Sequence, residues 1–313
     1  MEGINLETYG YKFVSNVDKN VSKYQKNDKN YFIKKFVTSK KQFNEIYISQ
    51  ILSHGTVIEY VKDNKIIKNE NEINKNDIKY SEIFIHNDHL YYVVEDAGTD
   101  LIGLIHRNKH FSEQDSKLIF LQLVNYIYRL HKIGIAHCDI STENICIEFI
   151  DNKPNLTLID FGLSRIHPSS SLNNMIDSEN YLFSGLKVHY NKSIDTFIGS
   201  IIPNCKRHGK ITYISPERHE ANTYYGTIYD LYKDDVYSLG VILHSMLLGY
   251  PPFMSPVLND SRFMAYLNGS WKIRLTKEMK HISHHAIDLI DKILKFENNR
   301  CTLDDIVNHP WLN

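Results

Sequence analysis

The hydrophobic pattern of this chain changes character near Gly98. Before that point, short runs rich in aromatic and β-branched residues, such as Tyr31–Val37 and Leu90–Val94, are typical of strands. After it, apolar residues recur at helical spacing, as in the stretch that begins at Ser112 and in residues 234–248. The pattern therefore predicts a strand-rich first third followed by a helical remainder.

This change divides the chain into two predicted parts. At 313 residues, the chain exceeds the size of a usual single core. The predicted fold class is α+β, with a small, mainly antiparallel sheet lobe at residues 1–97, a larger, mainly helical lobe at residues 98–313, and a cleft between them. Residues 62–80 consist mostly of Lys, Asn, Asp and Glu, so we interpret them as a solvated insertion in the first lobe.

The composition excludes several classes of protein. The formal net charge is −1, which argues against a general binder of polyanions, and we predict no nucleic acid partner. No apolar run is long enough to span a bilayer, and the first residues do not resemble a signal peptide, so we expect no membrane segment. The four cysteines lack metal-ligand spacing, which favours a reduced, intracellular and cytoplasmic location.

The residues that carry chemistry fall in three short stretches. Lys34 lies on a predicted strand, His137–Asn144 forms a loop after a predicted helix, and Asp160–Gly162 follows an apolar strand. Together they resemble the strand lysine, the catalytic loop and the metal-binding Asp-Phe-Gly triplet of eukaryotic protein kinases. Each stretch alone is a weak signal, but their occurrence in this order is specific.

Three downstream features carry the same resemblance. Ser215–Glu217 resembles the family's Ala-Pro-Glu triplet, and Asp235–Gly240 resembles the start of the helix that anchors the catalytic loop. Arg300 resembles the arginine that pairs with the glutamate of that triplet. The resemblance runs from about Tyr31 to the C-terminus. It implies the two-lobed protein kinase fold, with an activation segment at residues 160–217 that is long for the family.

The resemblance implies a phosphotransferase that uses ATP and Mg²⁺, or Mn²⁺ as an alternative cation, and acts on protein substrates. Phosphoryl transfer depends mainly on positioning and on charge neutralisation. Lys34 would contact the α- and β-phosphates and would be held by Glu45 on the following helix. Asp160 and Asn144 would bind the metal ions, because hard cations prefer oxygen ligands. Asp139 would accept or orient the proton of the attacking hydroxyl.

These assignments have simpler alternatives. Lys34 and Lys35 are both consistent with solvated strand charges, although strand alternation sends the two side chains to opposite faces. Asp139 and Asn144 belong to residue types that favour turns, so they are also consistent with a capped loop that has no catalytic role. The neighbouring motifs favour the catalytic interpretation.

The resemblance also places the adenine ring. It is expected to lie against the connection between the lobes, where backbone groups of Glu95 and Ala97 would bind it. Val94 would occupy the gatekeeper position, and its small side chain predicts an open pocket behind the nucleotide.

The glycine-rich loop that normally covers the phosphates is missing. No glycine occurs between Gly10 and Gly55. We expect Asn16, Asn20 and Asn27 to supply positive-φ turns in this region. The backbone would nevertheless approach phosphate less closely than a glycine-rich loop does.

The catalytic loop also departs from the family pattern. Cys138 replaces the arginine that usually receives an activation-loop phosphate, so we expect that ordering switch to be absent. Ser141 replaces the lysine that neutralises the transferring phosphoryl group. In serine/threonine kinases that lysine lies beside a threonine, and the matching stretch here is Gly209–Tyr213. We hypothesise that Lys210 supplies the cation and Ser141 the hydroxyl; the alternative is that Lys210 points to solvent or to substrate.

One subfamily shares several of these departures. The strand Phe32–Lys35, the absent glycine loop and Lys210 together resemble the FIKK kinases of apicomplexan parasites, which also carry a hydroxyl residue in place of the catalytic-loop lysine. A divergent kinase of a large DNA virus is the alternative. The subfamily resemblance adds export to a host cell as an alternative to a cytoplasmic location.

Three functions compete. A pseudokinase scaffold is favoured by the missing glycines and by the changed catalytic-loop lysine. A small-molecule kinase is disfavoured, because the downstream features belong to the peptide-binding helical lobe. An active protein kinase is favoured by the retained residues Lys34, Glu45, Asp139, Asn144 and Asp160, and the family resemblance favours serine and threonine over tyrosine as acceptors. The sequence leaves the oligomeric state open.

Overall fold

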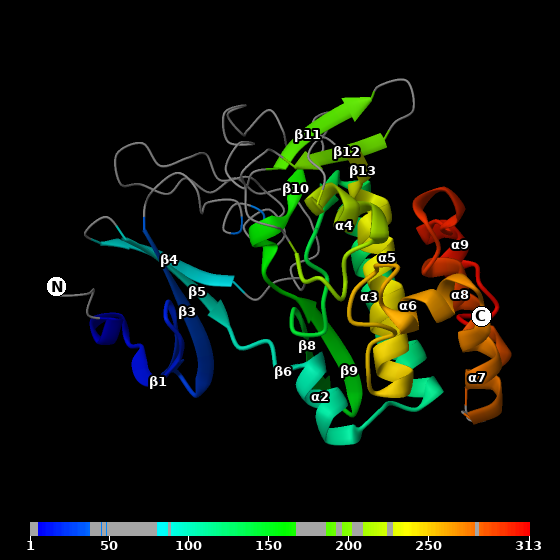
Figure 1. Ribbon diagram of the computed structural model, residues 1–313. Coiled ribbons are helices and arrows are strands. Elements are labelled where there is room, and N and C mark those ends of the chain that lie inside the picture. The colour runs from blue at the N-terminus through cyan, green and yellow to red at the C-terminus, as the bar shows by residue number, and fades with distance from the viewer. Residues whose placement is uncertain are drawn as a thin grey trace. The chain divides into compact units, whose positions relative to one another are not determined.

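The computed structural model describes residues 6–37, 45, 48, 80–86, 89–166, 186–191, 196–201, 209–223, 228–278 and 282–313. The chain divides into two compact units, Met1–Gly98 and Thr99–Asn313 (Figure 1). Because the first unit holds an antiparallel sheet and the second most of the described helices, the predicted α+β fold class is confirmed. The predicted insertion at 62–80, apart from Tyr80, and parts of the segment 160–217 lie outside the described residues.

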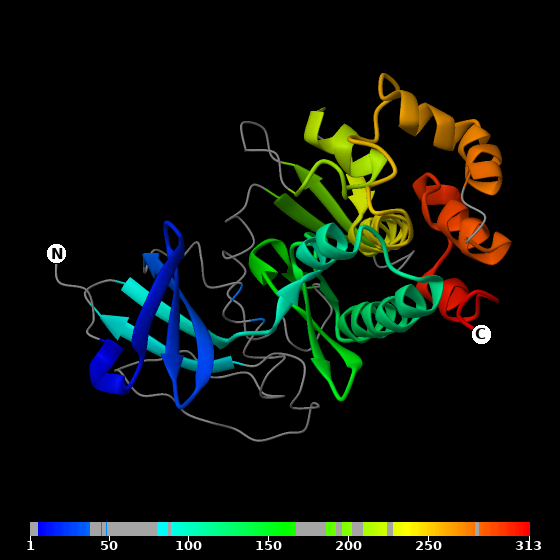
Figure 2. The ribbon, with the colours of Figure 1, turned by 90° about the horizontal axis from the view of Figure 1, so that it is seen from below.

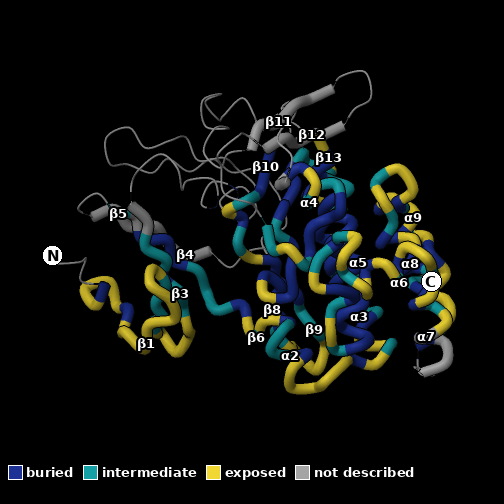
Figure 3. The backbone as a smooth tube through the Cα atoms, viewed as in Figure 1, coloured by how far each residue is buried: buried dark blue, intermediate teal, exposed yellow. Residues whose placement is uncertain are grey.

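The strands of the first unit form one antiparallel sheet in the order β1-β2-β3-β5-β4 (Figure 2). Figure 3 shows β1 in yellow, because each of its residues is exposed. Ile33, Tyr91 and Val93 instead form a buried cluster with residues that precede the sheet. The elements are a short 3-10 helix (Leu6–Tyr9), β1 (Lys12–Asp18), β2 (Val21–Lys26), β3 (Lys29–Val37), β4 (Tyr80–His86) and β5 (His89–Glu95).

The hairpin turns of this sheet confirm the expected positive φ at Asn27 but not at Asn16 or Asn20. Asn27 and Asp28 have φ of 50° and 61°, as a two-residue turn of the type I′ class requires. Asn16 and Asn20 do not have positive φ, so that expectation was wrong for these two residues. The reason is strand pairing: Asn16 lies inside β1, and the Asn20 carbonyl accepts a hydrogen bond from the backbone of Lys35 at 2.8 Å.

The second unit is built mainly of helices. Helix α5 lies at its centre and packs against α3 and α8; its dark blue colour in Figure 3 reflects burial along most of its length. No helix among the described residues combines the length and apolar character needed to cross a bilayer. The helices are α2 (Leu101–Asn108), α3 (Glu113–Lys132), α4 (Pro216–Thr223), α5 (Leu231–Leu248), α6 (Ser261–Leu267), α7 (Ser270–Glu278), α8 (His284–Ile293) and α9 (Leu303–Val307).

Short strands connect these helices in three small sheets, with the orders β6-β8-β9, β10-β7 and β11-β12-β13. The segment 160–217, which the resemblance marks as the activation segment, contains three strands within its described part. The strands are β6 (Thr99–Asp100), β7 (Ile135–Ala136), β8 (Ile145–Ile150), β9 (Lys153–Leu158), β10 (Arg165–Ile166), β11 (Leu186–Asn191), β12 (Thr196–Ile201) and β13 (Ile228–Asp230).

Helix α3 begins where the sequence predicts. The Ser112 side chain accepts a hydrogen bond from the backbone N–H of Asp115, so it caps the helix. The predicted apolar stripe is buried and is confirmed; its members are Ile119, Leu123, Ile127 and Leu130. This stripe holds α3 against the core of the second unit.

Gly249 ends helix α5, where the chain packs closely against the backbone of Lys109. Its φ is +81°, and a Cβ at this position would lie 1.9 Å from the Lys109 carbonyl oxygen. Gly269 has a similar φ of +76° but nothing within 4 Å of its added Cβ. Gly249→Ala is expected to lower the free energy of unfolding by at least about 2 kcal/mol more than Gly269→Ala, since only the first adds a clash to the backbone strain. Equal losses in urea denaturation would contradict this packing.

Candidate active site

The loop between β7 and β8 is anchored by one carboxylate of helix α5. The side chain of Asp235 is fully buried, and it accepts a hydrogen bond at 2.8 Å from each of the backbone N–H groups of His137 and Cys138. Cys138 has a φ of 64°, which a residue with a side chain rarely adopts. The loop is therefore held in a strained conformation by contacts with the core.

Asp139 and Asn144 lie together on this loop. The Asn144 Nδ2 atom donates to the Asp139 carbonyl oxygen at 2.8 Å and to its carboxylate at 3.0 Å. Burial raises the pKa of the Asp139 carboxyl, an effect that the positive charge of Lys210 partly offsets. The side-chain amide of Asn144 therefore fixes the orientation of the half-buried Asp139 carboxylate.

Lys210 enters the same neighbourhood from a distant part of the chain. Its Nζ donates to the Ser141 hydroxyl oxygen at 2.6 Å and lies 3.5 Å from the Asn144 side-chain oxygen. The same ammonium is 3.5 Å from the carboxylate of Glu143. The structure thus places the ammonium of Lys210 beside Ser141, the position at which the family's lysine is missing from the catalytic loop.

Asp160 lies at the start of the next stretch, at the N-terminus of a single 3-10 turn, Phe161–Leu163. Its backbone is left-handed, with φ of 63°, and its carboxylate accepts a hydrogen bond from the Gly162 N–H at 3.3 Å. The ring of Phe161 is buried against His137, with ring centroids 4.7 Å apart. Burial lowers the pKa of His137, so this imidazole is neutral, and it packs against Phe161.

Asp139 and Asp160 are close enough to interact electrostatically. The negative charge of Asp160 contributes to the raised pKa of Asp139. Asp160 and Asn144 therefore offer one carboxylate and one amide oxygen, a donor set that fits Mg²⁺ when phosphate oxygens complete its coordination. The described residues contain no cluster of three or more His, Cys, Asp and Glu side chains that would hold a metal by protein ligands alone.

In the first unit, Lys34 has the partner predicted for it. Its Nζ lies 2.7 Å from the carboxylate of Glu45, and Glu45 is helical as expected. The neighbouring Lys35 instead places its ammonium 5.6 Å from the ring centroid of Tyr91. The two adjacent lysines therefore engage different groups, as strand alternation predicts.

The residues expected to bind adenine lie at the end of β5 and just after it. Val94 and Glu95 are partly buried and Ala97 is buried. The Glu95 carboxylate pairs with the ammonium of Lys29 at 3.0 Å, and the Asp96 N–H donates to the Asn30 carbonyl at 2.9 Å. These contacts hold the end of β5 against β3.

The predicted pairing of Arg300 with Glu217 is confirmed. The guanidinium Nη2 of Arg300 lies 2.9 Å from the Glu217 carboxylate, and its Nη1 donates to the Lys233 carbonyl at 2.8 Å. This ion pair ties the start of α4 to the start of α5 and to the segment before α9.

A buried ion pair between Arg218 and Asp234 also contacts the catalytic loop, and sequence reasoning did not identify it. Each residue directly adjoins a recognised motif, but neither belongs to one. A charged residue beside a motif is most often solvated, so the sequence carried no signal that would have distinguished this pair.

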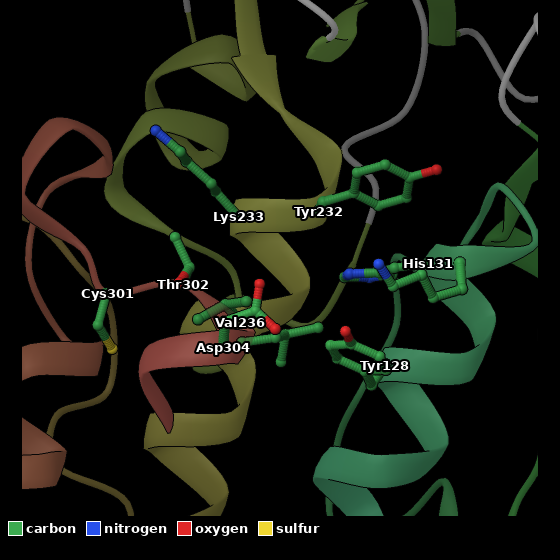
Figure 4. Close-up of a pocket in the computed structure, with 10 residues that line it drawn as sticks. Tyr128, His131, Tyr232, Lys233, Val236, Cys301, Thr302 and Asp304 are labelled. Atoms are coloured by element: carbon green, nitrogen blue, oxygen red, sulfur yellow. The ribbon is translucent and has the colours of Figure 1, made fainter. Parts of the chain in front are cut away.

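A pocket of about 280 Å³ lies elsewhere in the second unit, between α3, the start of α5 and residues 301–304 (Figure 4). The ring of His131 lies against Tyr232, with centroids 4.2 Å apart and planes tilted by 36°, and its Nε2 lies 3.0 Å from the Asp235 carboxylate. The residues that line this pocket do not include Asp139. The pocket is separate from the candidate site, and its lining residue His131 contacts the carboxylate that anchors the catalytic loop.

Comparison with known proteins gives a consistent result. The protein kinase domain family matches residues 15–312. The chain is 30% identical over 254 residues to MAP kinase-interacting serine/threonine-protein kinase 2 of Xenopus laevis, a match that covers 76% of this chain and 49% of the relative. It is 28% identical over 228 residues to the serine/threonine-protein kinase RAD53 of Saccharomyces cerevisiae, covering 71% of this chain and 24% of the relative. The chain thus spans about half or less of the length of these relatives.

Proposed function

Because this chain belongs to the protein kinase family, we propose that it transfers the γ-phosphate of ATP to a hydroxyl group of a protein substrate. The observation that carries the proposal is one hydrogen-bonded group in the second unit. Asp139, Asn144, Ser141 and Lys210 are linked directly, and Asp160 lies within electrostatic reach. A base, a cation and two oxygen ligands are thus gathered in one place, which is what phosphoryl transfer requires.

Each of these side chains has a role in the proposed reaction. Asp160 and Asn144 would hold Mg²⁺, which neutralises phosphate charge when it is bound. Asp139 would orient the substrate hydroxyl and accept its proton. In the first unit, Lys34 would contact the α- and β-phosphates, and its pairing with Glu45 supports this role because it fixes the ammonium in place.

The exchange of chemistry between positions 141 and 210 is part of the proposal. The ammonium of Lys210 would neutralise the transferring phosphoryl group, and its hydrogen bond to the Ser141 hydroxyl supports this assignment. The adenine ring would bind backbone groups of Glu95 and Ala97 beside Val94. This part of the proposal follows from the position of these residues at the end of β5.

Serine and threonine are the proposed acceptors. The relatives reported above are named serine/threonine-protein kinases, which supports this choice over tyrosine. Within the family, we propose a FIKK-type kinase, on the basis of Phe32–Lys35, Ser141 and Lys210.

Transfer of labelled phosphate tests the proposal. Incubation of the protein with Mg-ATP labelled in the γ-phosphate and a generic basic protein is expected to label serine and threonine residues. Removal of divalent cations with EDTA is expected to reduce the labelling to background, because the bound metal neutralises the phosphate charge in the proposed reaction. Hydrolysis of the product and separation of its phosphoamino acids measure the acceptor type.

One observation favours a second candidate, a pseudokinase that binds nucleotide or partners without efficient catalysis. The turn between β1 and β2 contains two residues and no glycine, so no glycine-rich loop covers the phosphates. If wild-type protein gave no transfer with Mg²⁺ or Mn²⁺, or if Asp160→Asn gave the same signal as wild type, the pseudokinase would be the better description.

A further inference from the structure

The position of Cys138 leaves the catalytic loop without a cation of its own. The Cys138 side chain is buried in a cluster with Ala136, Ala221, Tyr229 and Leu231. Burial raises the pKa of its thiol, so the sulfur is neutral. The loop therefore depends on other groups to hold the strained backbone at this residue.

Arg218, in the first turn of α4, supplies such a group. Its Nη1 donates to the Cys138 carbonyl oxygen at 2.7 Å and to the Asp234 carboxylate at 2.7 Å. The Cys138 N–H is bound on the other side by Asp235. The peptide groups on both sides of the Cys138 Cα are thus clamped, and the next residue is Asp139.

The same guanidinium packs against the backbone that precedes Lys210. Gly209 has φ of +82°, and a Cβ at this position would lie 2.8 Å from the Arg218 Nη2 atom. A side chain at position 209 would therefore displace the guanidinium. Arg218 contacts the residue before Asp139 and the residue before Lys210 at the same time.

A gain in folding stability does not explain why the ion pair of Arg218 and Asp234 is buried. The side chains of Arg218 and Asp234 are only 2% and 1% exposed. The Nε–H of Arg218 has no hydrogen-bond partner within the described part of the chain. Desolvation of an ion pair is costly, and a buried donor without an acceptor adds to that cost. Replacing a buried ion pair by apolar residues is often neutral or stabilising, so the contacts of this pair with the catalytic loop favour a positioning role.

We infer that Arg218 is a positioning residue that sets the geometry of Asp139 and Lys210 through Cys138 and Gly209. Its counterion is the internal carboxylate of Asp234. The geometry therefore does not require a phosphate added to the activation segment. This inference rests on the proposed function and goes beyond it, because it names what holds the two groups in place.

The test needs a variant that folds. Arg218→Met alone would leave Asp234 charged and buried, so the informative variant is Arg218→Met combined with Asp234→Asn. The asparagine oxygen can still accept the hydrogen bond that Asp234 receives from the Ser215 N–H at 2.9 Å. Arg107→Met, at an exposed arginine of α2, is the matched control.

The double variant is expected to keep the thermal stability and the nucleotide KM of wild type. Its kcat is expected to fall by about tenfold to a hundredfold, because a misplaced catalytic group reduces the rate without changing nucleotide contacts. Wild type stripped of phosphate by a phosphatase, and verified by mass spectrometry, is expected to keep its kcat within about twofold. An unchanged kcat in the double variant would overturn the positioning role, and loss of activity after phosphatase treatment would overturn the independence from phosphate.

Amide hydrogen exchange gives a readout that does not need turnover. In the double variant, exchange at residues 137–141 and 209–213 is expected to be at least about tenfold faster than in wild type, with exchange in α5 beyond residue 235 unchanged. Unchanged exchange in both segments would overturn the inference. Absence of transfer in wild type would overturn the proposed function alone, since the exchange measurement tests positioning separately.

Discussion

Asp139→Asn is expected to reduce kcat for phosphotransfer by about a thousandfold, because it removes the group that accepts the substrate proton. The substitution preserves the shape of the side chain and an oxygen that can accept the hydrogen bond from Asn144. Burial raises the pKa of Asp139, so its ionised form costs folding free energy near neutral pH. The variant should therefore be at least as stable as wild type, and steady-state kinetics with thermal unfolding measure both effects.

The pH dependence gives a second check on the same residue. Because the pKa of Asp139 is raised above that of an ordinary aspartate, the base becomes protonated at a higher pH than usual. The kcat of wild type should therefore fall as the pH is lowered through this raised pKa. The residual activity of Asp139→Asn should lack that acidic limb. A variant that kept the wild-type kcat and pH profile would remove Asp139 from the mechanism.

Lys210→Ala is expected to reduce kcat by about a hundredfold, the usual effect of removing one preorganised group that stabilises transition-state charge. The positive charge of Lys210 lowers the pKa of Asp139, so its removal should also move the acidic limb of the pH profile to higher pH. The shift measures the proximity of the ammonium to Asp139, and the loss of kcat measures its part in the reaction. Lys153→Ala, at an exposed lysine of β9, is the control and should leave both quantities unchanged.

An exchange of residues makes the Lys210 prediction sharper. Lys210→Thr alone should lose as much activity as Lys210→Ala, because threonine provides no cation. Combining it with Ser141→Lys should restore part of the activity, since the ammonium then comes from the catalytic loop and the hydroxyl from position 210. A loss of less than about threefold in Lys210→Ala, which corresponds to well under 1 kcal/mol, would rule out the proposed exchange.

Local sequence patterns predicted several parts of this protein accurately. The cap at Ser112 and the buried stripe of α3 depend on residues three and four positions apart, so they can be read from a short window. The pairing of Arg300 with Glu217 followed from a family resemblance carried by short motifs. The prediction of positive φ at Asn16 and Asn20 failed, because strand pairing and not residue type determined their conformations.

By itself, the sequence determined the order of strands and helices and the residue types that a phosphotransferase needs. These properties depend on periodicity and on short motifs, which act within a few residues. The tertiary structure alone decided which distant groups meet: Lys210 reaches a hydroxyl 69 positions earlier, and Arg218 reaches a carbonyl 80 positions earlier. Such contacts form only when the core around α5 brings remote segments together, and a buried charge persists there only when its partners are already in place.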